Sequence, residues 1–365
     1  MATLAQSVEI THFSGSYAAE DVELLLQPTN VAPTDVATKE KLIQTGKRHY
    51  SEMISEERAP DPAYVGVYEK ALDAGSKRMA NDLARLAQAL SREIAGDITL
   101  VSLVRAGLPV GVVLKRALKA LGRDVAHYGV SIIRDRGIDE QAMRHITARR
   151  DPAGVVFVDG WTGKGAIIGE LEKSLAGSDV LPRLVVVADP CGRAWLSASG
   201  DDWLIPSGIL GATVSGLVSR SILNDEIIAS GGFHGCLDLV SLSRHDVSRA
   251  FVDQIWAQMG LRLLHAEAAV WTDADRARHS AVAQATVGRI VADYSVSNLN
   301  RVKPGIAEAT RAVLRRMPER VFISDPFDPD LAALVYLATD RGVRLETLHG
   351  GIAPYRAVTL IGKAS

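Results

Sequence analysis

Residues 154–165 read Gly154-Val-Val-Phe-Val-Asp-Gly-Trp-Thr-Gly-Lys-Gly165. The apolar run Val155 to Val158 predicts a buried strand, and Asp159 stands at its carboxyl end. The glycine-spaced turn that follows leads into a helix predicted from Ala166 to Leu175. Backbone N–H groups at such a helix start can bind phosphate oxygens, and Lys164 adds a positive charge. The alternative is an ordinary strand-to-helix turn, which also favours Gly and Thr.

Further apolar strands are predicted on both sides of this segment, in Ile98 to Val104, Ala126 to Ile133 and Leu184 to Pro190. Helices predicted from Val110 to Leu121, and in a short stretch ending near Ala148, separate them. Apolar strands that alternate with helices are typical of a parallel sheet covered on both faces, in which ligands bind outside the carboxyl ends of the strands. These ends fall at Ser102–Gly107, Arg134–Gly137, Asp159–Gly165 and Asp189–Gly192.

Other helices are predicted at Ala19–Leu26, Lys39–Ile54, Tyr64–Ile94, Arg244–Leu264 and Asp273–Val291. The second of these holds a basic cluster, Lys47, Arg48 and His49, which is either a solvated face or a weak candidate for contacting an anionic ligand. After residue 296 the chain alternates again. It predicts helices at Gly305–Arg315 and Pro329–Asp340 and strands at Arg320–Ser324, Val343–Leu348 and Ala357–Ile361. This is a compact unit of small-domain size.

The totals describe a globular protein: 365 residues, 47% of them hydrophobic and 23% charged, with a formal net charge of -2. This length predicts two domains, and the charge balance excludes wholesale binding of polyelectrolytes. Residues 1–10 show no basic region followed by an apolar run, so a cytoplasmic location and no membrane contact are expected. The two cysteines, Cys191 and Cys236, cannot form a disulfide framework and lack zinc-site spacing.

We expect three segments: a main domain at 1–270 with a helical N-terminal extension, a helical linker at 271–295, and a small domain at 296–365. The last segment contains ten Lys and Arg against seven Asp and Glu, whereas the preceding residues carry a net charge of -5. A basic module of this kind permits a nucleic-acid partner without requiring one.

The strand, acid, turn and helix at Val155 to Ala166 resemble the sugar-phosphate signature of type I phosphoribosyltransferases. The resemblance implies that Asp159 binds ribose and that Thr162, Gly163, Lys164 and Gly165 bind the 5'-phosphate of phosphoribosyl pyrophosphate (PRPP). Gly160 occupies the place where that family usually carries a second acid. The implied fold is α/β, with a type I phosphoribosyltransferase-like parallel sheet and helices on both faces.

A second loop, Ser102-Leu-Val-Arg-Ala-Gly-Leu-Pro-Val-Gly111, resembles the pyrophosphate loop of the same enzymes. Ser102, Arg105, Ala106 and Gly107 would then hold pyrophosphate. Arg134 and Arg136 would close over it from a mobile loop, or would form an exposed hairpin with Asp135 and Asp139. Charge develops on the leaving pyrophosphate, so arginines and a Mg²⁺ ion that arrives with PRPP would balance it. The expected catalytic residues are Asp159, Arg105, Arg134 and Arg136.

The whole chain is similar to a bacterial family associated with tellurium-resistance and stress operons. Five stretches carry this resemblance: Ile10–Tyr17, Gln44–Met53, Phe157–Gly165, Asp189–Gly192 and Leu217–Arg220. The family bears two labels, a phosphoribosyltransferase fused to an RNA-binding domain and a cysteine protease called StiP. Under the first label, the acceptor side would be formed by Asp189, Cys191, Gly192, Ser215 and Arg220.

The protease label requires a nucleophile, and Cys191 at a predicted strand end suits this role better than Cys236. His234, in Gly231-Gly-Phe-His-Gly235, is the candidate base. A thiol and an imidazole from distant segments can form a dyad. The alternative is that Cys191 is a small packing residue and His234 a loop residue.

The C-terminal segment resembles the RNA-binding domain of Pelota and of kink-turn-binding ribosomal proteins, a small α/β/α unit. Lys303-Pro-Gly-Ile-Ala-Glu-Ala-Thr-Arg311 carries the likeness, which implies RNA contacts by Lys303, Gly305, Glu308 and Arg311. Otherwise Glu308 simply favours a helix N-terminus and Arg311 a helix surface.

Three functions follow, and the first is our expectation: transfer of a phosphoribosyl group from PRPP to a nitrogenous, base-like acceptor, with an RNA-binding tail. The alternatives are a cysteine peptidase that uses Cys191 and His234, and a non-catalytic nucleotide or RNA sensor. The expected partners are PRPP and structured RNA, and a homodimer is left open.

Overall fold

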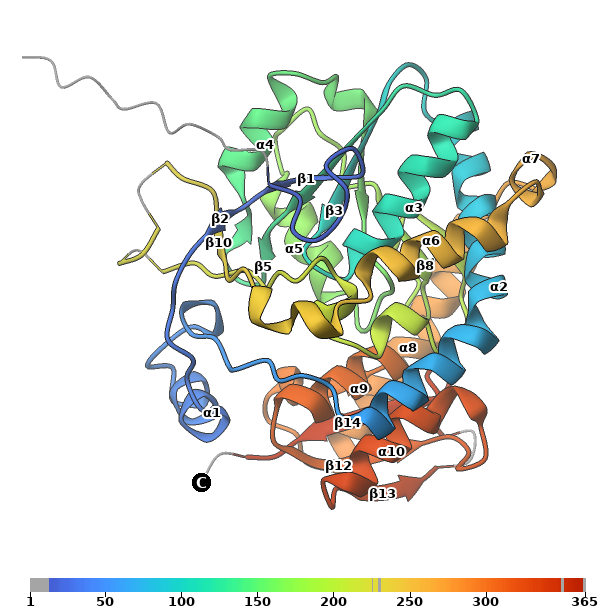
Figure 1. The fold of residues 1–365 in the computed structure, drawn as a ribbon. Coiled ribbons are helices and arrows are strands. Elements are labelled where there is room, and N and C mark those ends of the chain that lie inside the picture. Colours follow the sequence, from blue (N-terminus) through green and yellow to red (C-terminus); the bar gives the residue numbers. More distant parts are fainter. Residues whose placement is uncertain (1–12, 225, 229–230, 349–350, 364–365) are drawn as a thin grey trace, which may run out of the picture.

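The structure is a computed structural model that describes residues 13–224, 226–228, 231–348 and 351–363. Residues Ile10 to His12 of the N-terminal motif lie outside the described residues. Figure 1 shows a larger unit built around a central sheet and a smaller C-terminal unit, drawn in orange and red, packed against it.

The central sheet has the strand order β1-β4-β3-β7-β8-β9, and each pair of neighbouring strands is parallel. Its strands are β1 (Glu23–Leu25), β3 (Ile98–Leu103), β4 (Val125–Val130), β7 (Val155–Val158), β8 (Leu184–Ala188) and β9 (Leu196–Ser199). The predicted parallel sheet is therefore confirmed.

Successive side chains of a strand pack alternately in two hydrophobic clusters, one on each face of the sheet. Val156 and Val158 pack in a cluster with side chains of α2 (Pro62–Glu93), α3 (Gly107–Ala120) and α6 (Ser248–Met259). Val155 and Phe157 pack in the other cluster, with α4 (Glu140–Thr147) and α5 (Ala166–Ser174). Since both faces of β7 are covered, every residue of this strand has to be apolar, as its sequence is.

The segment Ala19–Leu26 is not the helix that we expected. Its residues 23–25 form β1, which pairs with residues 128–130 of β4 at the edge of the sheet. Leu24 is buried on one face and Leu25 on the other, so the strand needs consecutive apolar residues. A short run of this kind looks the same as one turn of a buried helix, and pairing with β4 decides between them.

Two other predicted helices are shorter than expected. Within Lys39–Ile54, α1 (Val36–Gln44) ends before Gly46, which has a φ of 68°, and residues 50–52 form a single 3₁₀ turn. Within Arg244–Leu264, a 3₁₀ turn (Val240–His245) precedes α6, and Gly260 separates α6 from α7 (Arg262–His265).

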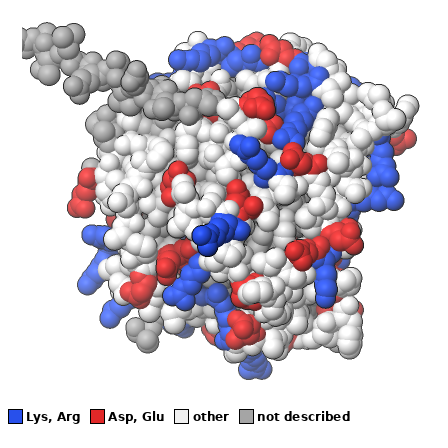
Figure 2. Space-filling view, in the orientation of Figure 1, with Lys and Arg blue, Asp and Glu red and all other residues white. Residues whose placement is uncertain are grey.

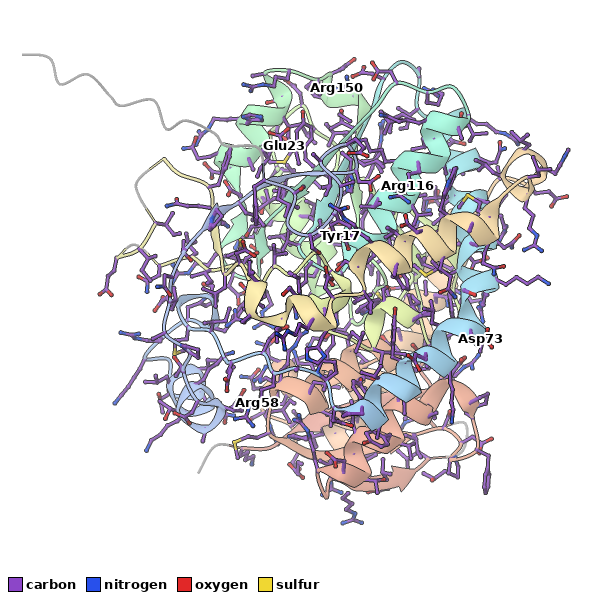
Figure 3. All side chains as sticks on the ribbon, in the orientation of Figure 1. Tyr17, Glu23, Arg58, Asp73, Arg116 and Arg150 are labelled. Atoms are coloured by element: carbon purple, nitrogen blue, oxygen red, sulfur yellow. The ribbon has the colours of Figure 1, made fainter. Side chains whose placement is uncertain are left out.

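Smaller elements close the larger unit. β2 (Gln27–Pro28) pairs with β10 (Gly235–Cys236), and β5 (Ile132–Ile133) forms a hairpin with β6 (Gly137–Ile138). Figure 3 labels Tyr17 and Arg116, whose side chains hold the N-terminal segment against the rest of the larger unit. Arg116 of α3 forms ion pairs with Asp21 and with Asp253 of α6, and the hydroxyl of Tyr17 donates to the carbonyl of Val214.

The C-terminal unit contains a second sheet, with the strand order β11-β14-β12-β13. Its strands are β11 (Val302–Pro304), β12 (Pro318–Ile323), β13 (Arg344–Thr347) and β14 (Ala357–Ile361). One face packs on α9 (Ile306–Arg315) and α10 (Ala332–Asp340), and the other packs on α8 (Asp273–Asp293). The helix predicted as a linker is thus part of this unit's core, and the boundaries at 270 and 295 stay a prediction.

The two units share one hydrophobic core. The cluster on the α2 face of the main sheet continues into Ile306 of α9 and Leu334 of α10, and the rings of Tyr64 and Tyr336 stack with centroids 5.9 Å apart. Among the described residues, no helix combines the length and the apolar character that a membrane span needs.

Candidate functional site

The loops after β3, β7 and β8 lie side by side, because these strands are neighbours in the sheet. Gly107 allows the first loop to approach the second. A Cβ atom built on it would lie only 2.1 Å from the carbonyl oxygen of Val158, so no other residue fits there. A cavity of about 410 Å³ opens beside these loops and is closed on its far side by the C-terminal unit.

Eleven of the predicted site residues line this cavity. They are Ala106, Arg134, Asp159, Thr162, Gly163, Lys164, Gly165, Arg220, Lys303, Glu308 and Arg311. The turn after β7, from Asp159 to Gly165, therefore forms a wall of the cavity. The remaining predicted site residues lie outside the lining, and several of them are held by partners that the sequence did not reveal.

Asp159 lies in the cavity wall at the end of β7. Its Oδ1 accepts a hydrogen bond from the backbone N–H of Gly160 at 2.8 Å. Burial raises the pKa of Asp159 to about 7, because it disfavours the charged carboxylate more than this hydrogen bond and Arg311 favour it. Asp159 is therefore protonated in part at neutral pH.

The turn from Thr162 to Gly165 is bound to neighbouring protein groups. The ammonium group of Lys164 donates to the carbonyl oxygens of Leu299 and Val302, the latter at 3.1 Å. The hydroxyl of Tyr355 donates to the carbonyl oxygen of Gly163 at 2.9 Å. This predicted phosphate turn thus connects the larger unit to the C-terminal unit.

Arg105 is buried and stands behind the cavity rather than in its lining. It forms an ion pair with Glu57, and its Nη1 donates to the carbonyl of Val218 at 2.8 Å. Burial works to raise the pKa of Glu57, but Arg105 and Arg315 lower it to about 2. Glu57, which the sequence did not single out, therefore holds the arginine that we expected to bind pyrophosphate.

Arg134 and Arg136 lie on the β5–β6 hairpin. Arg134 forms an ion pair with Asp135 at 3.2 Å and lies over the ring of Tyr50, while Arg136 forms an ion pair with Glu52 at 2.8 Å. Arg220 packs against the same Tyr50 ring, 5.3 Å from its centroid. The guanidinium groups of Arg134 and Arg220 therefore both pack against the ring of Tyr50 at the edge of the cavity.

Asp189, after β8, is the centre of a hydrogen-bond network. Its carboxylate accepts from the hydroxyl of Thr162 at 2.5 Å, from the backbone N–H of Ala194 at 2.8 Å and from the indole of Trp271 at 3.2 Å. Ser215, another residue predicted on the acceptor side, is buried and donates to the carbonyl of Gly211. Asp189 organises the turn that carries Cys191.

Cys191 is almost completely buried, with 3% of its surface exposed. Its Sγ lies 3.6 Å from a carboxylate oxygen of Asp189. Burial, and then the charge of Asp189, raise the pKa of the thiol to about 12. The side chain belongs to the hydrophobic cluster of the C-terminal unit, which also contains Ala283 of α8 and Val358 of β14.

His234 lies away from Cys191. Its Nδ1 is 2.7 Å from the hydroxyl of Ser131, which follows β4, and its backbone N–H donates to Asp139. Ser131 follows β4 and Cys191 follows β8, and these two strands are separated by β3 and β7, which at about 4.8 Å per strand spacing puts them roughly 14 Å apart. The structure does not bring the predicted dyad together.

A different histidine lies beside the Cys191 turn. Gly192, with a φ of 64°, is so close to α8 that a Cβ atom built on it would lie 2.2 Å from the carbonyl of Arg276 and 3.0 Å from Cβ of His279. The imidazole of His279 packs against Trp271, with ring centroids 5.2 Å apart. The sequence places His279 one turn before Ala283 on α8, but nothing in it shows that α8 covers this turn.

The predicted RNA-binding residues face the larger unit. Glu308 lies against Gly163, and the guanidinium of Arg311 lies 4.5 Å from the ring centroid of Trp161. Gly305 has a φ of 90°, and the next backbone N–H, that of Ile306, donates to Asp202 at 3.0 Å. In this arrangement Lys303, Glu308 and Arg311 line the cavity between the two units, while Gly305 lies outside its lining.

The cavity does not fit a divalent cation well. Two carboxylates, Asp159 and Glu308, face nine Lys and Arg side chains in its lining. Hard cations such as Mg²⁺ prefer several oxygen ligands of negative charge, and the surrounding cations repel them. Binding of Mg²⁺ therefore stays a prediction that the lining of this cavity does not favour.

Two known families match this chain. The family described as "Tellurite-like stress resistance cysteine protease StiP" matches residues 15–256, and the "PELOTA RNA binding domain" matches residues 281–363. A protein of Acinetobacter baylyi named "Cysteine protease StiP" is 48% identical over 365 residues, which cover 96% of this chain and 94% of the relative.

These matches correct the expected activity. The prediction of a phosphoribosyltransferase is wrong, because a relative that aligns along almost the whole chain is named a cysteine protease. The glycine turn and the strand-end acid led to this error, since they describe the architecture of a sheet edge and not its chemistry. This chain belongs to the family of the tellurite-like stress resistance cysteine protease StiP and carries a Pelota RNA-binding domain at its C-terminus.

Proposed function

We propose that this protein is a cysteine protease whose nucleophile is Cys191. The observation that carries the proposal is the position of Cys191 in a turn at the carboxyl end of β8, beside the carboxylate of Asp189 and against α8. The chain contains two cysteines. The other, Cys236, is a fully buried residue of β10, which pairs with β2.

His279 is the proposed base, because its Cβ already lies beside the Cys191 turn. Its imidazole packs against Trp271 and lies beside Gly200, so it has to reorient before it can accept the proton of Sγ. The proton of the thiol then passes to the imidazole as Sγ attacks the carbonyl carbon of a peptide bond, and from there to the leaving amine. Water, deprotonated by the same imidazole, hydrolyses the thioester and restores the thiol.

The raised pKa of Cys191 fits a general-base mechanism better than a stable thiolate–imidazolium pair. At neutral pH the thiol carries its proton, so the base must take it during the attack. Because the thiol is buried in a cluster with residues of α8 and β14, a substrate should reach it only after the C-terminal unit moves.

Cleavage of casein by four variants tests this proposal with matched pairs. Cys191→Ser and His279→Gln should abolish cleavage, while Cys236→Ser and His234→Gln should retain it. Loss of activity in Cys236→Ser together with full activity in Cys191→Ser would refute the assignment.

A second activity, RNA binding, is favoured by the Pelota match and by the basic residues of β11 and α9. RNA binding would belong to the C-terminal unit once this unit has moved away from the larger unit.

For the larger unit, we propose a likeness to type I phosphoribosyltransferases in architecture alone. A role in tellurite-like stress resistance follows from the description of the family, and loss of tellurite tolerance in a Cys191→Ser strain would test it.

A further inference from the structure

The cavity between the two units is unusually rich in positive charge. Its nine cations come from both sides: from the larger unit Lys39, Arg134, Lys164 and Arg220, and from the C-terminal unit Arg301, Lys303, Arg311, Arg315 and Arg316. On the outer face shown in Figure 2, by contrast, basic and acidic residues are interspersed. The face in this view thus lacks the excess of positive charge that the cavity lining has.

Four of the nine cations have a carboxylate partner. Arg134 pairs with Asp135, Arg301 with Glu319, Arg315 with Glu57 and Arg316 with Glu40. Within the described parts of the chain, the other five form no ion pair: Lys39, Lys164, Arg220, Lys303 and Arg311. Asp159 and Glu308 are the carboxylates in the lining, so the cations without an ion pair outnumber the carboxylates that face them.

Several donors in this cluster also lack hydrogen-bond partners. Nε and Nη2 of Arg311 and Nη1 of Arg220 are buried nitrogens without an acceptor in the described structure. Folded proteins rarely leave buried donors of charged groups unpaired, because each loses its water without replacement. These N–H groups therefore lack an acceptor that a bound molecule could supply.

The titration of the cluster agrees with this geometry. Burial, followed by repulsion from neighbouring cations, lowers the pKa of Lys39 and of Lys164 to about 7. Burial lowers the pKa of Arg311 to about 10, and Arg105 beside it adds to the effect. Such crowding of like charges is relieved when an anion enters.

We propose that this cavity binds a small molecule that carries two or more linked phosphate groups, held between the larger unit and α9. An excess of cations spread over several residues of the lining matches a diphosphate or longer chain better than a single carboxylate, and arginine forks bind phosphate oxygens in pairs. A volume of about 410 Å³ is that of a small-ligand pocket, whereas an RNA helix needs an open surface. The site goes beyond the proposed protease and does not involve Cys191.

Binding of inorganic triphosphate to the full chain tests this site, by calorimetry and thermal shift at constant ionic strength. We expect one saturable site and a raised Tm. Sulfate at the same ionic strength should give neither, because it lacks the linked charges. ATP that binds more tightly than triphosphate would identify a nucleotide as the source of the phosphates, and equal binding would identify the phosphate chain alone.

Arg311→Gln should weaken triphosphate binding by about tenfold or more, because it removes a charged fork from the cavity. Arg311→Lys should lie between this variant and the wild type, which a general folding defect would not produce. Arg278→Gln on the exposed side of α8 is the control and should bind as the wild type does. Cys191→Ser should bind normally even if it abolishes proteolysis.

Three results would overturn the proposal: no saturable binding of triphosphate, equal binding by Arg311→Gln and the wild type, or binding by sulfate of equal strength. Saturable, Arg311-dependent binding of a short structured RNA without any binding of triphosphate would also overturn it, and would assign the cluster to RNA.

Discussion

At the scale of single residues, the environment of Cys191 decides how its chemistry can be observed. The thiol lies in an apolar core and its nearest charged group is the carboxylate of Asp189, so both influences disfavour the thiolate. As the proposed nucleophile, this thiol should react only after it is uncovered. Two predictions at this scale rest on raised pKa values.

The first prediction concerns the alkylation of Cys191 by iodoacetamide in a Cys236→Ser background. Because the pKa is raised to about 12, the rate in the folded chain should keep rising well above pH 8.5, the usual midpoint of a free cysteine. Asp189→Asn removes the nearby negative charge and should increase the rate at pH 8. Mass spectrometry of time points measures both rates, and a plateau near pH 8.5 in the parent chain would contradict the prediction.

The second prediction concerns Asp159, whose pKa is raised by burial to about 7 from 3.8. A carboxyl group with a raised pKa favours the folded state below its unfolded pKa, and this contribution is lost as pH rises through 7. The wild type should therefore lose more stability than Asp159→Asn between pH 5 and pH 8, by on the order of 1–3 kcal/mol. Urea unfolding at both pH values measures the difference. Asp273→Asn, at an exposed site, is the control, and parallel pH profiles for Asp159→Asn and the wild type would show the prediction to be wrong.

At the scale of helices and strands, the sequence predicted the elements that a local hydrophobic pattern defines. The apolar strands β3, β7 and β8, and the placement of Asp159 and Asp189 at their carboxyl ends, follow from periodicity and from the geometry of parallel sheets. The edge strand β1 was missed because its short apolar run is defined only by pairing with β4, about a hundred residues later in the chain.

The partners of the site residues could not be predicted for a similar reason. Arg105 meets Glu57, Lys164 meets Val302, and Cys191 lies beside α8, all through packing between distant segments. No local pattern encodes such contacts. The motif residues were therefore placed at the right edge of the sheet, while their functions were assigned from a resemblance that the relatives then corrected.

The third prediction concerns the start of α9, which is held by Asp202 of the larger unit. Its carboxylate accepts from the backbone N–H groups of Ile306 at 3.0 Å and of Arg356 at 2.8 Å. Asp202→Ala leaves both donors buried without a partner, which should cost about 1–3 kcal/mol. Hydrogen exchange should speed up at these two amides. Asp201→Ala, which removes half-exposed ion pairs, should change stability little, and unaltered exchange in Asp202→Ala would contradict this role.

At the scale of the whole molecule, the packing of the C-terminal unit against the larger unit affects three features. The C-terminal unit buries Cys191, turns Lys303 and Arg311 towards the larger unit, and closes the cationic cavity. The hydrophobic core that runs from α2 into α9 and α10 stabilises this closed state. Proteolysis and RNA binding should therefore both require opening, whereas a phosphate-bearing ligand should favour closure.

The fourth prediction tests this coupling with a single perturbation and two readouts. Asp202→Ala weakens the contact between the units, so it should increase both the affinity for a short structured RNA and the alkylation rate of Cys191, each by several-fold. Adding Arg311→Gln should cancel the gain in RNA affinity, because it removes a proposed phosphate contact, but should leave the gain in alkylation. Val186→Ala, in the fully buried strand β8, is the control for general destabilisation. If this control raises both readouts as much as Asp202→Ala does, opening between the units is not the cause, because loss of overall stability alone would then expose the thiol and the RNA-binding residues.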